Sequence, residues 1–192
     1  MKYIINIHGY NGKKENNIYR SLMKMDFDNN IHIISIQLTN SPINDYNSLL
    51  NLIKSLNGPT IITSKSLGSF YGCIFNGYFD IPCICFNPSF NPLNNINFNK
   101  DDEDFIIKHN YNFFDFNRNI TCYISKEDKR IDQVKQFQDF KFLKYTDNIV
   151  LSNYNHDFDG IEYDIDLLNQ FKNKILFYFN EIDKFNIDSI DY

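Results

Sequence analysis

Apolar and polar positions along this chain follow two alternating patterns. Short apolar runs, rich in β-branched residues, are typical of strands that are covered on both faces. The segments between them have the three- and four-residue apolar spacing of helices. The expected strands are Tyr3–His8, Ile31–Gln37, Thr60–Thr63, Ile81–Phe86, Ile120–Ser125 and Asn148–Leu151.

The predicted helices follow these strands in turn. In the first of them, Ile18, Leu22 and Met25 fall on one face. Before the second, Ser41 is expected to cap the helix, with Pro42 in its first turn. The expected helical segments are Glu15–Met25, 41–53, Gly68–Gly77, Asp132–Phe140 and the long amphipathic Ile161–Phe185.

This alternation predicts an α/β fold: a three-layer α/β/α sandwich around a mostly parallel sheet. We expect one domain over residues 1–185, followed by an acidic tail at residues 186–192. The pattern weakens at residues 89–119, which are rich in Asn, Asp and Phe, and there we expect a short lid-like insert. Sites in such sheets form at the carboxyl ends of the strands, so the loops that follow them should lie along one edge.

Composition and charge narrow the possible partners. The net charge is −5, and no basic run is present, so nucleic acid is not an expected partner. No apolar run is long enough to span a bilayer, and the N-terminus lacks a signal-peptide pattern, so a cytoplasmic location is expected. Ala and Trp are absent while Asn, Ile, Lys, Phe and Tyr are abundant, which we attribute to nucleotide bias rather than to function.

The four cysteines give no sign of a metal site. Cys73, Cys83, Cys85 and Cys122 lie in apolar segments without zinc-type spacing, so buried free thiols are expected. No metal and no cofactor is expected, and the sequence leaves the oligomeric state open.

The segment Ser64-Lys65-Ser66-Leu67-Gly68 carries the clearest chemical signal. A β-branched strand runs directly into a turn of small residues around a serine, and a helical pattern follows. That layout is typical of a nucleophile elbow, which raises one serine hydroxyl above the end of a strand. The first glycine of the usual Gly-x-Ser-x-Gly pattern is replaced here by Ser64, and Ser69 follows Gly68. We predict that Ser66 is the nucleophile.

A serine nucleophile needs a base and an orienting carboxylate, in the chain order Ser, acid, His. His156, in the polar loop after the last predicted strand, is the expected base. Asp128 is the expected acid because it follows the strand that ends at Ser125. Glu127 and Asp132 remain alternatives, although Asp132 is better placed to cap the next helix.

The remaining expectations concern the groups around the reacting atoms. The backbone N–H groups of Tyr10 and Leu67 should form the oxyanion hole. We expect Gly9, Asn11, Lys65 and Asn87, on the same loops, to contact the substrate. Lys65 either favours anionic acyl groups or faces solvent. Phe105, Phe113, Phe114 and Phe116 of the insert line an apolar pocket or form ordinary core.

Four segments in this order resemble the α/β-hydrolase superfamily and, within it, the YqiA-like small esterases. The resemblance rests on the opening strand with His8-Gly9-Tyr10-Asn11, on the elbow, on Asn87-Pro88, and on Asp128 with His156-Asp157-Phe158. It implies a compact α/β-hydrolase fold and a serine esterase or thioesterase acting on a small-molecule ester or thioester through a Ser-His-Asp triad.

Two other functions fit the pattern less well. The elbow of the family that the chain resembles has glycine where Ser64 and Ser69 stand here, and these replacements would suit a catalytically inactive hydrolase fold used for binding. The β/α alternation alone would also suit a flavodoxin-like nucleotide-binding domain, but no Gly-rich phosphate loop follows the first strand.

Overall fold

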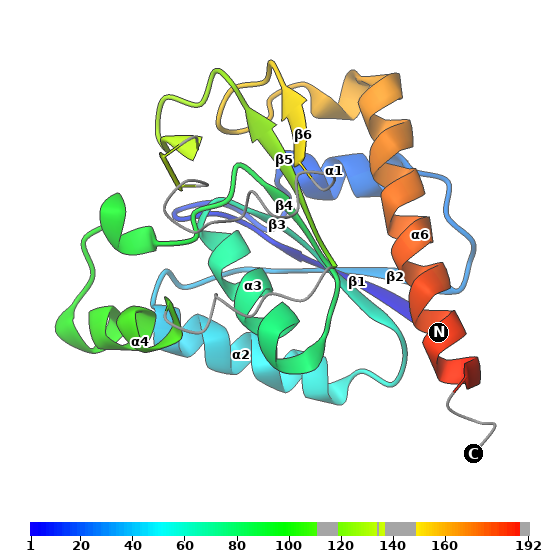
Figure 1. Ribbon diagram of the computed structural model, residues 1–192, viewed down its shortest axis with the longest axis horizontal. Coiled ribbons are helices and arrows are strands. Elements are labelled where there is room, and N and C mark those ends of the chain that lie inside the picture. Colours follow the sequence, from blue (N-terminus) through cyan, green and yellow to red (C-terminus); the bar gives the residue numbers. More distant parts are fainter. Residues whose placement is uncertain (111–118, 134, 137–148, 189–192) are drawn as a thin grey trace.

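The structure, a computed structural model, describes residues 1–110, 119–133, 135–136 and 149–188. Its centre is an open sheet of six parallel strands in the order β2-β1-β3-β4-β5-β6 (Figure 1). This confirms the predicted α/β class. The strands are β1 (Lys2–Ile7), β2 (Ile31–Ile36), β3 (Thr60–Lys65), β4 (Cys83–Phe86), β5 (Ile120–Ser125) and β6 (Ile149–Ser152).

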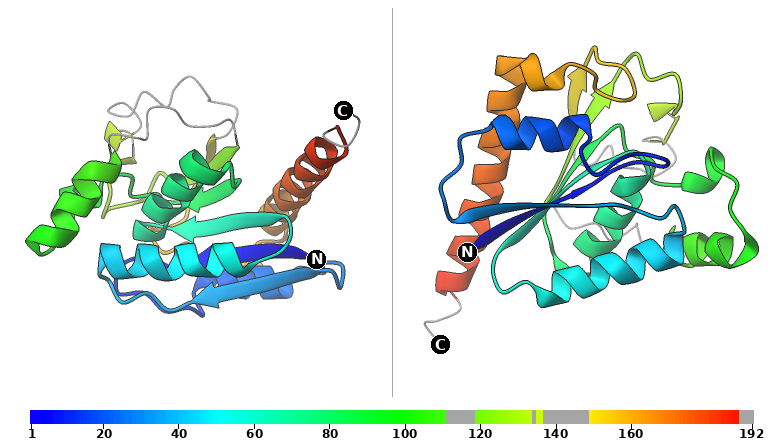
Figure 2. Two further views of the ribbon diagram at one scale, coloured as in Figure 1. Left: turned by 90° about the horizontal axis from the view of Figure 1, so that it is seen from below. Right: turned by 180° about the vertical axis from the view of Figure 1, so that it is seen from behind.

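Helices cover both faces of the sheet, which gives the predicted three layers (Figure 2). Helices α2 and α3 pack on one face, and α1 and α6 pack on the other. Helix α4 packs against α2 rather than on the sheet. The helices are α1 (Asn17–Lys24), α2 (Pro42–Ser55), α3 (Leu67–Phe79), α4 (Lys100–Asn110) and α6 (Ile165–Asp188).

The apolar runs of the strands explain the two cores. Successive side chains of a strand point to opposite faces, so a run of isoleucines supplies both layers. Ile5 and Ile62 belong to the core under α2 and α3, whereas Ile4 and Ile61 belong to the core under α1 and α6. All four side chains are fully buried.

The insert differs from the expectation because it contains a regular helix, α4. Asp102 of this helix accepts hydrogen bonds from the Ser41 hydroxyl at 3.2 Å and from the backbone N–H of Ile43 at 3.1 Å. Ser41 is the N-cap residue of α2 and Pro42 lies in the first turn, as predicted, but the Ser41 hydroxyl makes no capping hydrogen bond. The carboxylate of Asp102 satisfies the N-terminus of α2 from a distant part of the chain.

The last helix differs from the sequence prediction at both ends. The last helix begins at Ile165, after a 3-10 turn at Ile161–Tyr163, and it continues to Asp188, beyond the expected domain end at 185. Most of the predicted helix at 132–140 lies outside the described residues.

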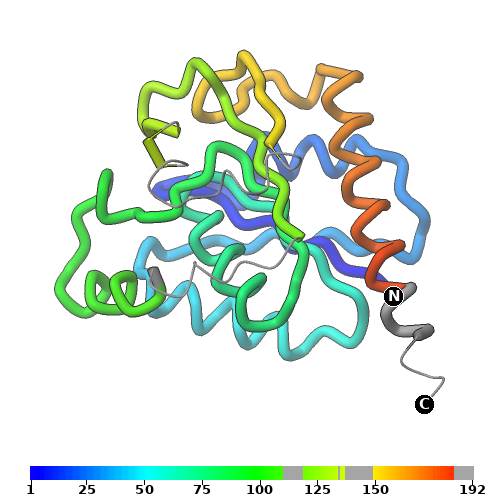
Figure 3. Tube along the Cα trace, viewed as in Figure 1, coloured from blue at the N-terminus to red at the C-terminus, as the bar shows by residue number. Residues whose placement is uncertain are grey.

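The N-terminus lies beside the last turns of α6 (Figure 3), where Lys2 Nζ is 2.7 Å from Asp183 Oδ2. Over the described segments, every helix is too short or too polar to cross a membrane.

Candidate active site

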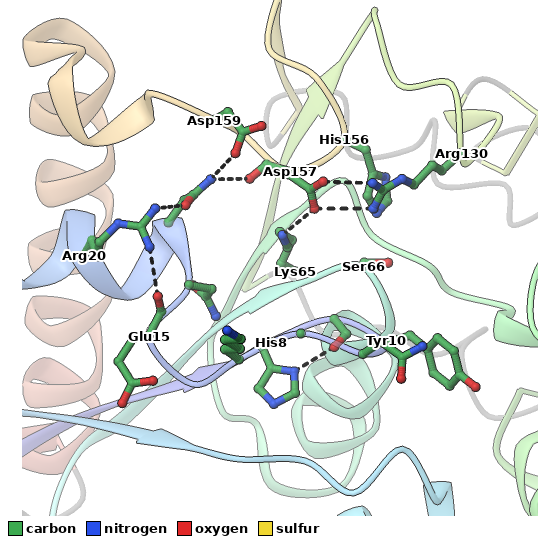
Figure 4. A pocket seen from close by; sticks show the side chains of 16 residues that line it. His8, Tyr10, Glu15, Arg20, Lys65, Ser66, Arg130, His156, Asp157 and Asp159 are labelled. Carbon is green, nitrogen blue, oxygen red and sulfur yellow. Dashed lines mark hydrogen bonds and ion pairs between the residues drawn. The ribbon is translucent and has the colours of Figure 1, made fainter.

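The loops that follow β1, β3, β5 and β6 converge on one pocket of about 440 Å³ (Figure 4). They come together because the strands are parallel, so that their carboxyl ends share one edge of the sheet. The lining residues include His8, Gly9, Tyr10, Asn11, Lys65, Ser66, Arg130, His156 and Asp157.

Ser66 occupies a strained position between β3 and α3. Its φ of 51° and ψ of −122° are uncommon for a residue with a Cβ. Three backbone hydrogen bonds hold it: its N–H donates to the Phe86 carbonyl at 3.0 Å, and its carbonyl accepts from the N–H groups of Ser69 at 2.9 Å and Ser89 at 3.1 Å. The Ser66 hydroxyl has no hydrogen-bond partner among the described residues, and the side chain lines the pocket.

Glycine is required at position 68 for the elbow to form. A Cβ there would lie 2.4 Å from the Ile7 carbonyl oxygen and 2.7 Å from that of His8. Both oxygens belong to the backbone at the end of β1, so they could move apart from a Cβ only if β1 itself moved. The glycine therefore permits α3 to start directly against the loop that follows β1.

The two serines that replace elbow glycines are accommodated together. Ser64 donates a hydrogen bond to the Ser69 hydroxyl at 3.2 Å, and both side chains are fully buried. Space for the Ser64 hydroxyl comes from Gly72, where a Cβ would approach it to 3.3 Å. Because this hydrogen bond joins the two hydroxyls, neither buried oxygen is left without a partner.

His156, which lines the pocket, forms a buried pair with Asp128. His156 Nδ1 lies 2.9 Å from Asp128 Oδ2 and 3.0 Å from Oδ1. The Asp128 side chain is 1% exposed. Burial alone raises the pKa of this carboxyl, but hydrogen bonds from His156, from Gln133 and from the backbone N–H of Arg130 outweigh it and hold the pKa below its ordinary value.

The other two carboxylates of this loop lie elsewhere. Asp132 Oδ1 accepts the backbone N–H of Lys135 at 2.9 Å, which is the capping role that its position indicated. Glu127 is exposed. Asp128 is thus the acid of this loop that reaches His156.

His8 is buried beneath the loop that follows β1. Its Nε2 accepts the backbone N–H of Leu38 at 2.9 Å, so the proton of the neutral ring lies on Nδ1, which donates to the Gly9 carbonyl at 2.6 Å. Burial lowers the pKa of His8, which favours this neutral form. The Gly12 N–H also donates to the Gly9 carbonyl, at 3.0 Å.

The hydrogen bonds from His8 and Gly12 to the Gly9 carbonyl orient the peptide unit between Gly9 and Tyr10. In a trans peptide the C=O and the following N–H point in opposite directions, and no cis bond occurs in the described chain. The Gly9 carbonyl faces His8, so the Tyr10 N–H points away from it. Neither this N–H nor that of Leu67, at the start of α3, has an acceptor within the described structure.

The four expected substrate contacts lie in different surroundings. Gly9 stands against Ser66, since a Cβ there would lie 2.9 Å from Ser66 Cβ. Asn11 lines the pocket. Lys65 also lines it, and its Nζ lies 2.8 Å from Asp157 Oδ1. Asn87 is fully buried and does not belong to the pocket lining.

The Asn87 side chain instead joins three loops. Its Nδ2 donates to the carbonyls of Asn155 and His156, each at 3.1 Å, and its Oδ1 accepts the Ser125 N–H at 2.7 Å. The residue has a φ of 41°, which asparagine tolerates better than most residues. Asn87 thereby fixes the backbone on which His156 is carried.

Sequence reasoning did not identify Asp157 and Arg130 as parts of this site. Asp157 accepts from Lys65 and also lies 3.0 Å from Arg130 Nη2 (Figure 4). The one signal in the sequence was proximity, because Asp157 follows His156 and Arg130 lies two residues after Asp128. Opposite charges next to expected catalytic residues do not reveal their pairing.

The cysteines and the described part of the insert do not line the pocket. All four cysteines are buried free thiols, with Cys83 Sγ and Cys85 Sγ 3.4 Å apart. In the described part of the chain no group of side chains has the arrangement of a metal site. Phe105 packs between Tyr46 and Phe70, as ordinary core. Phe113, Phe114 and Phe116 lie outside the described residues.

Comparisons with known proteins identify the family. Residues 3–173 match the Uncharacterised protein family (UPF0227). No curated protein sequence matches the chain.

Several solved structures share the fold at low sequence identity. Est1E from Butyrivibrio proteoclasticus has a TM-score of 0.64 at 13% identity, covering 91% of this chain and 88% of its own. The Pyrococcus furiosus esterase Pf2001 has a TM-score of 0.62 at 13% identity, covering 91% and 82%. XC6422 from Xanthomonas campestris, described as an a/b serine hydrolase without lid, has a TM-score of 0.57 at 12% identity, covering 91% and 82%. The chain therefore belongs to the UPF0227 family, and its fold is that of these α/β hydrolases.

Proposed function

We propose that this protein is a serine hydrolase that cleaves carboxylic esters or thioesters of small molecules. The observation that carries the proposal is the arrangement at the sheet edge. A serine with a strained backbone, whose hydroxyl has no partner among the described residues, shares one pocket with a histidine. The Nδ1 atom of that histidine is hydrogen-bonded to a buried carboxylate. Similarity to proteins described as esterases and serine hydrolases supports the same reaction class.

In the proposed reaction Ser66 Oγ attacks the ester carbonyl carbon while His156 Nε2 takes the hydroxyl proton. The new C–O bond forms as the carbonyl π electrons move to the oxygen. When the tetrahedral intermediate collapses, His156 returns the proton to the leaving alcohol or thiol, and Ser66 is acylated. Water then repeats the sequence and releases the acid.

Asp128 holds the imidazole with Nδ1 protonated and stabilises the imidazolium as it forms. The Ser66 and His156 side chains are not hydrogen-bonded in this structure, a contact that often tightens only when substrate binds. The negative oxygen of the intermediate would be bound by the N–H groups of Leu67 and Tyr10. The bonds from His8 and Gly12 to the Gly9 carbonyl favour this role because they orient the Tyr10 N–H in advance.

The test is hydrolysis of p-nitrophenyl acetate by the wild type and by Ser66→Ala. We expect the substitution to abolish turnover while the melting temperature stays within a few degrees, since Ser66 Oγ makes no hydrogen bond to a described residue. Ser69→Ala is a matched control, because this neighbouring serine is buried against Ser64 and does not line the pocket. Unchanged activity in Ser66→Ala would refute the assignment.

Labelling with a fluorophosphonate separates the enzyme from an inactive binding protein of the same fold. Covalent modification of Ser66 in the wild type supports the hydrolase. A folded wild-type protein that neither labels nor turns over ester would favour the binding protein.

A further inference from the structure

Three charged side chains form a network beside the proposed catalytic residues, and each is a sequence neighbour of one of them. Lys65 directly precedes Ser66, Arg130 lies two residues after Asp128, and Asp157 directly follows His156. Asp157 is the centre (Figure 4): its Oδ1 lies 2.8 Å from Lys65 Nζ, and its Oδ2 lies 3.0 Å from Arg130 Nη2.

The sheet itself does not connect the loops that this network joins. Ser66 follows β3 and His156 follows β6, and strands β4 and β5 lie between these two. Ladder hydrogen bonds therefore cannot set the distance from the elbow to the histidine loop directly. The ion pair between Lys65 and Asp157 spans this gap with one side-chain contact.

Burial distinguishes the two cations of the network. The Lys65 side chain is 11% exposed, whereas that of Arg130 is 65% exposed. The charge of a lysine whose side chain is largely buried is costly unless it is paired, so loss of Asp157 would leave the Lys65 ammonium group without an ion-pair partner among the described residues. The contact of Arg130 is open to water and screening ions, so it contributes less.

We propose that Lys65 and Asp157 are positioning residues whose ion pair holds the Ser66 elbow and the His156 loop in register for proton transfer, with Arg130 as a weaker support. This rests on the proposed function. The ammonium group of Lys65 is already paired with Asp157 inside the protein. Lys65 therefore positions the elbow rather than recognising an anionic acyl group.

The test is a double-mutant cycle with Lys65→Met, Asp157→Asn and the double variant. We expect each single variant to lower kcat roughly tenfold or more, because small misplacements of reacting groups are costly, while KM changes little. The double variant should be no worse than the poorer single variant, because both changes break the same contact. Arg130→Gln should lose less than Lys65→Met.

Lys2→Met is the matched control, since it removes an ion pair of similar length, 2.7 Å to Asp183, at a site remote from the pocket. We expect it to leave kcat unchanged. Melting temperatures of all variants are measured together, and only kcat should distinguish Lys65→Met from Lys2→Met.

Each other outcome has a defined meaning. Wild-type kcat in Lys65→Met, or losses that multiply in the double variant, overturns the inference while the hydrolase remains. A KM effect in Lys65→Met that is confined to carboxylated esters overturns it in favour of anion recognition. A wild type that neither labels with fluorophosphonate nor cleaves esters overturns the proposed function and this inference together.

Discussion

Replacing Gly9 by alanine places a methyl group directly against the proposed nucleophile. The added Cβ would lie 2.9 Å from Ser66 Cβ, 3.4 Å from the Lys65 carbonyl oxygen and 3.5 Å from Ser66 Oγ. The elbow is not easily displaced, because backbone hydrogen bonds to Phe86 and Ser89 hold Ser66 in place. The loop that carries Gly9 and Tyr10 must therefore move away.

The size of this movement follows from the contact distance. Non-bonded carbon atoms are best placed about 3.5–4.0 Å apart, so the loop has to move by roughly 1 Å. The Tyr10 N–H, proposed as an oxyanion donor, moves with it. Displacement or loss of one such donor costs about a hundredfold or more in rate, which is about 2.7 kcal/mol of transition-state stabilisation.

The assay is kcat/KM for p-nitrophenyl acetate together with the melting temperature. Gly77→Ala is the control, because Gly77 lies within α3 and a Cβ there meets nothing within 4 Å. The control should keep full activity and gain about 0.5–1 kcal/mol of stability, since alanine suits a helix better than glycine. Wild-type activity in Gly9→Ala would refute the close approach of this loop to the nucleophile, and a loss explained by global unfolding would refute its role in the oxyanion site.

Two other predictions concern the residues that hold His156. Asn87→Ala removes two donated and one accepted hydrogen bond in a buried site, so it should lower the free energy of unfolding by about 3 kcal/mol in urea titrations; a change below about 1 kcal/mol would contradict the bridging role. The lowered pKa of Asp128 means that its carboxylate stabilises the fold fully above its ordinary pKa of about 4, and that this contribution is lost as the pH falls through the lower folded value. Between about pH 6 and pH 3, wild type should therefore lose more stability than Asp128→Asn, and equal losses would contradict the reasoning.

The sequence determined the order of the elements and the edge of the sheet on which the proposed catalytic residues lie. Isoleucine pairs such as Ile4-Ile5 and Ile61-Ile62 can be buried only in a sheet that is covered on both faces, so they predicted the three layers that the structure shows. Once the strands are parallel, loops that follow them share an edge, which is why Ser66 and His156 could be proposed as partners from chain order alone.

Contacts between distant segments could not be predicted in this way. The apolar periodicity of the insert is weak, so it did not predict α4. Asp102 of this helix caps α2, whose N-terminus lies some sixty positions earlier in the chain. The replacement of two elbow glycines motivated the alternative of an inactive protein, but the sequence could not show that the hydroxyls of Ser64 and Ser69 bond to each other inside the fold.

The same limit applies to the charges at the site. Lys65 and Asp157 are far apart in sequence, and either could have been a solvated surface residue. Only the folding of β3 and β6 into one sheet brings them to 2.8 Å. Local sequence patterns therefore determined the strands, the elbow and their order, whereas the tertiary structure decided which polar side chains meet, because hydrogen bonds and ion pairs depend on distances that local patterns do not contain.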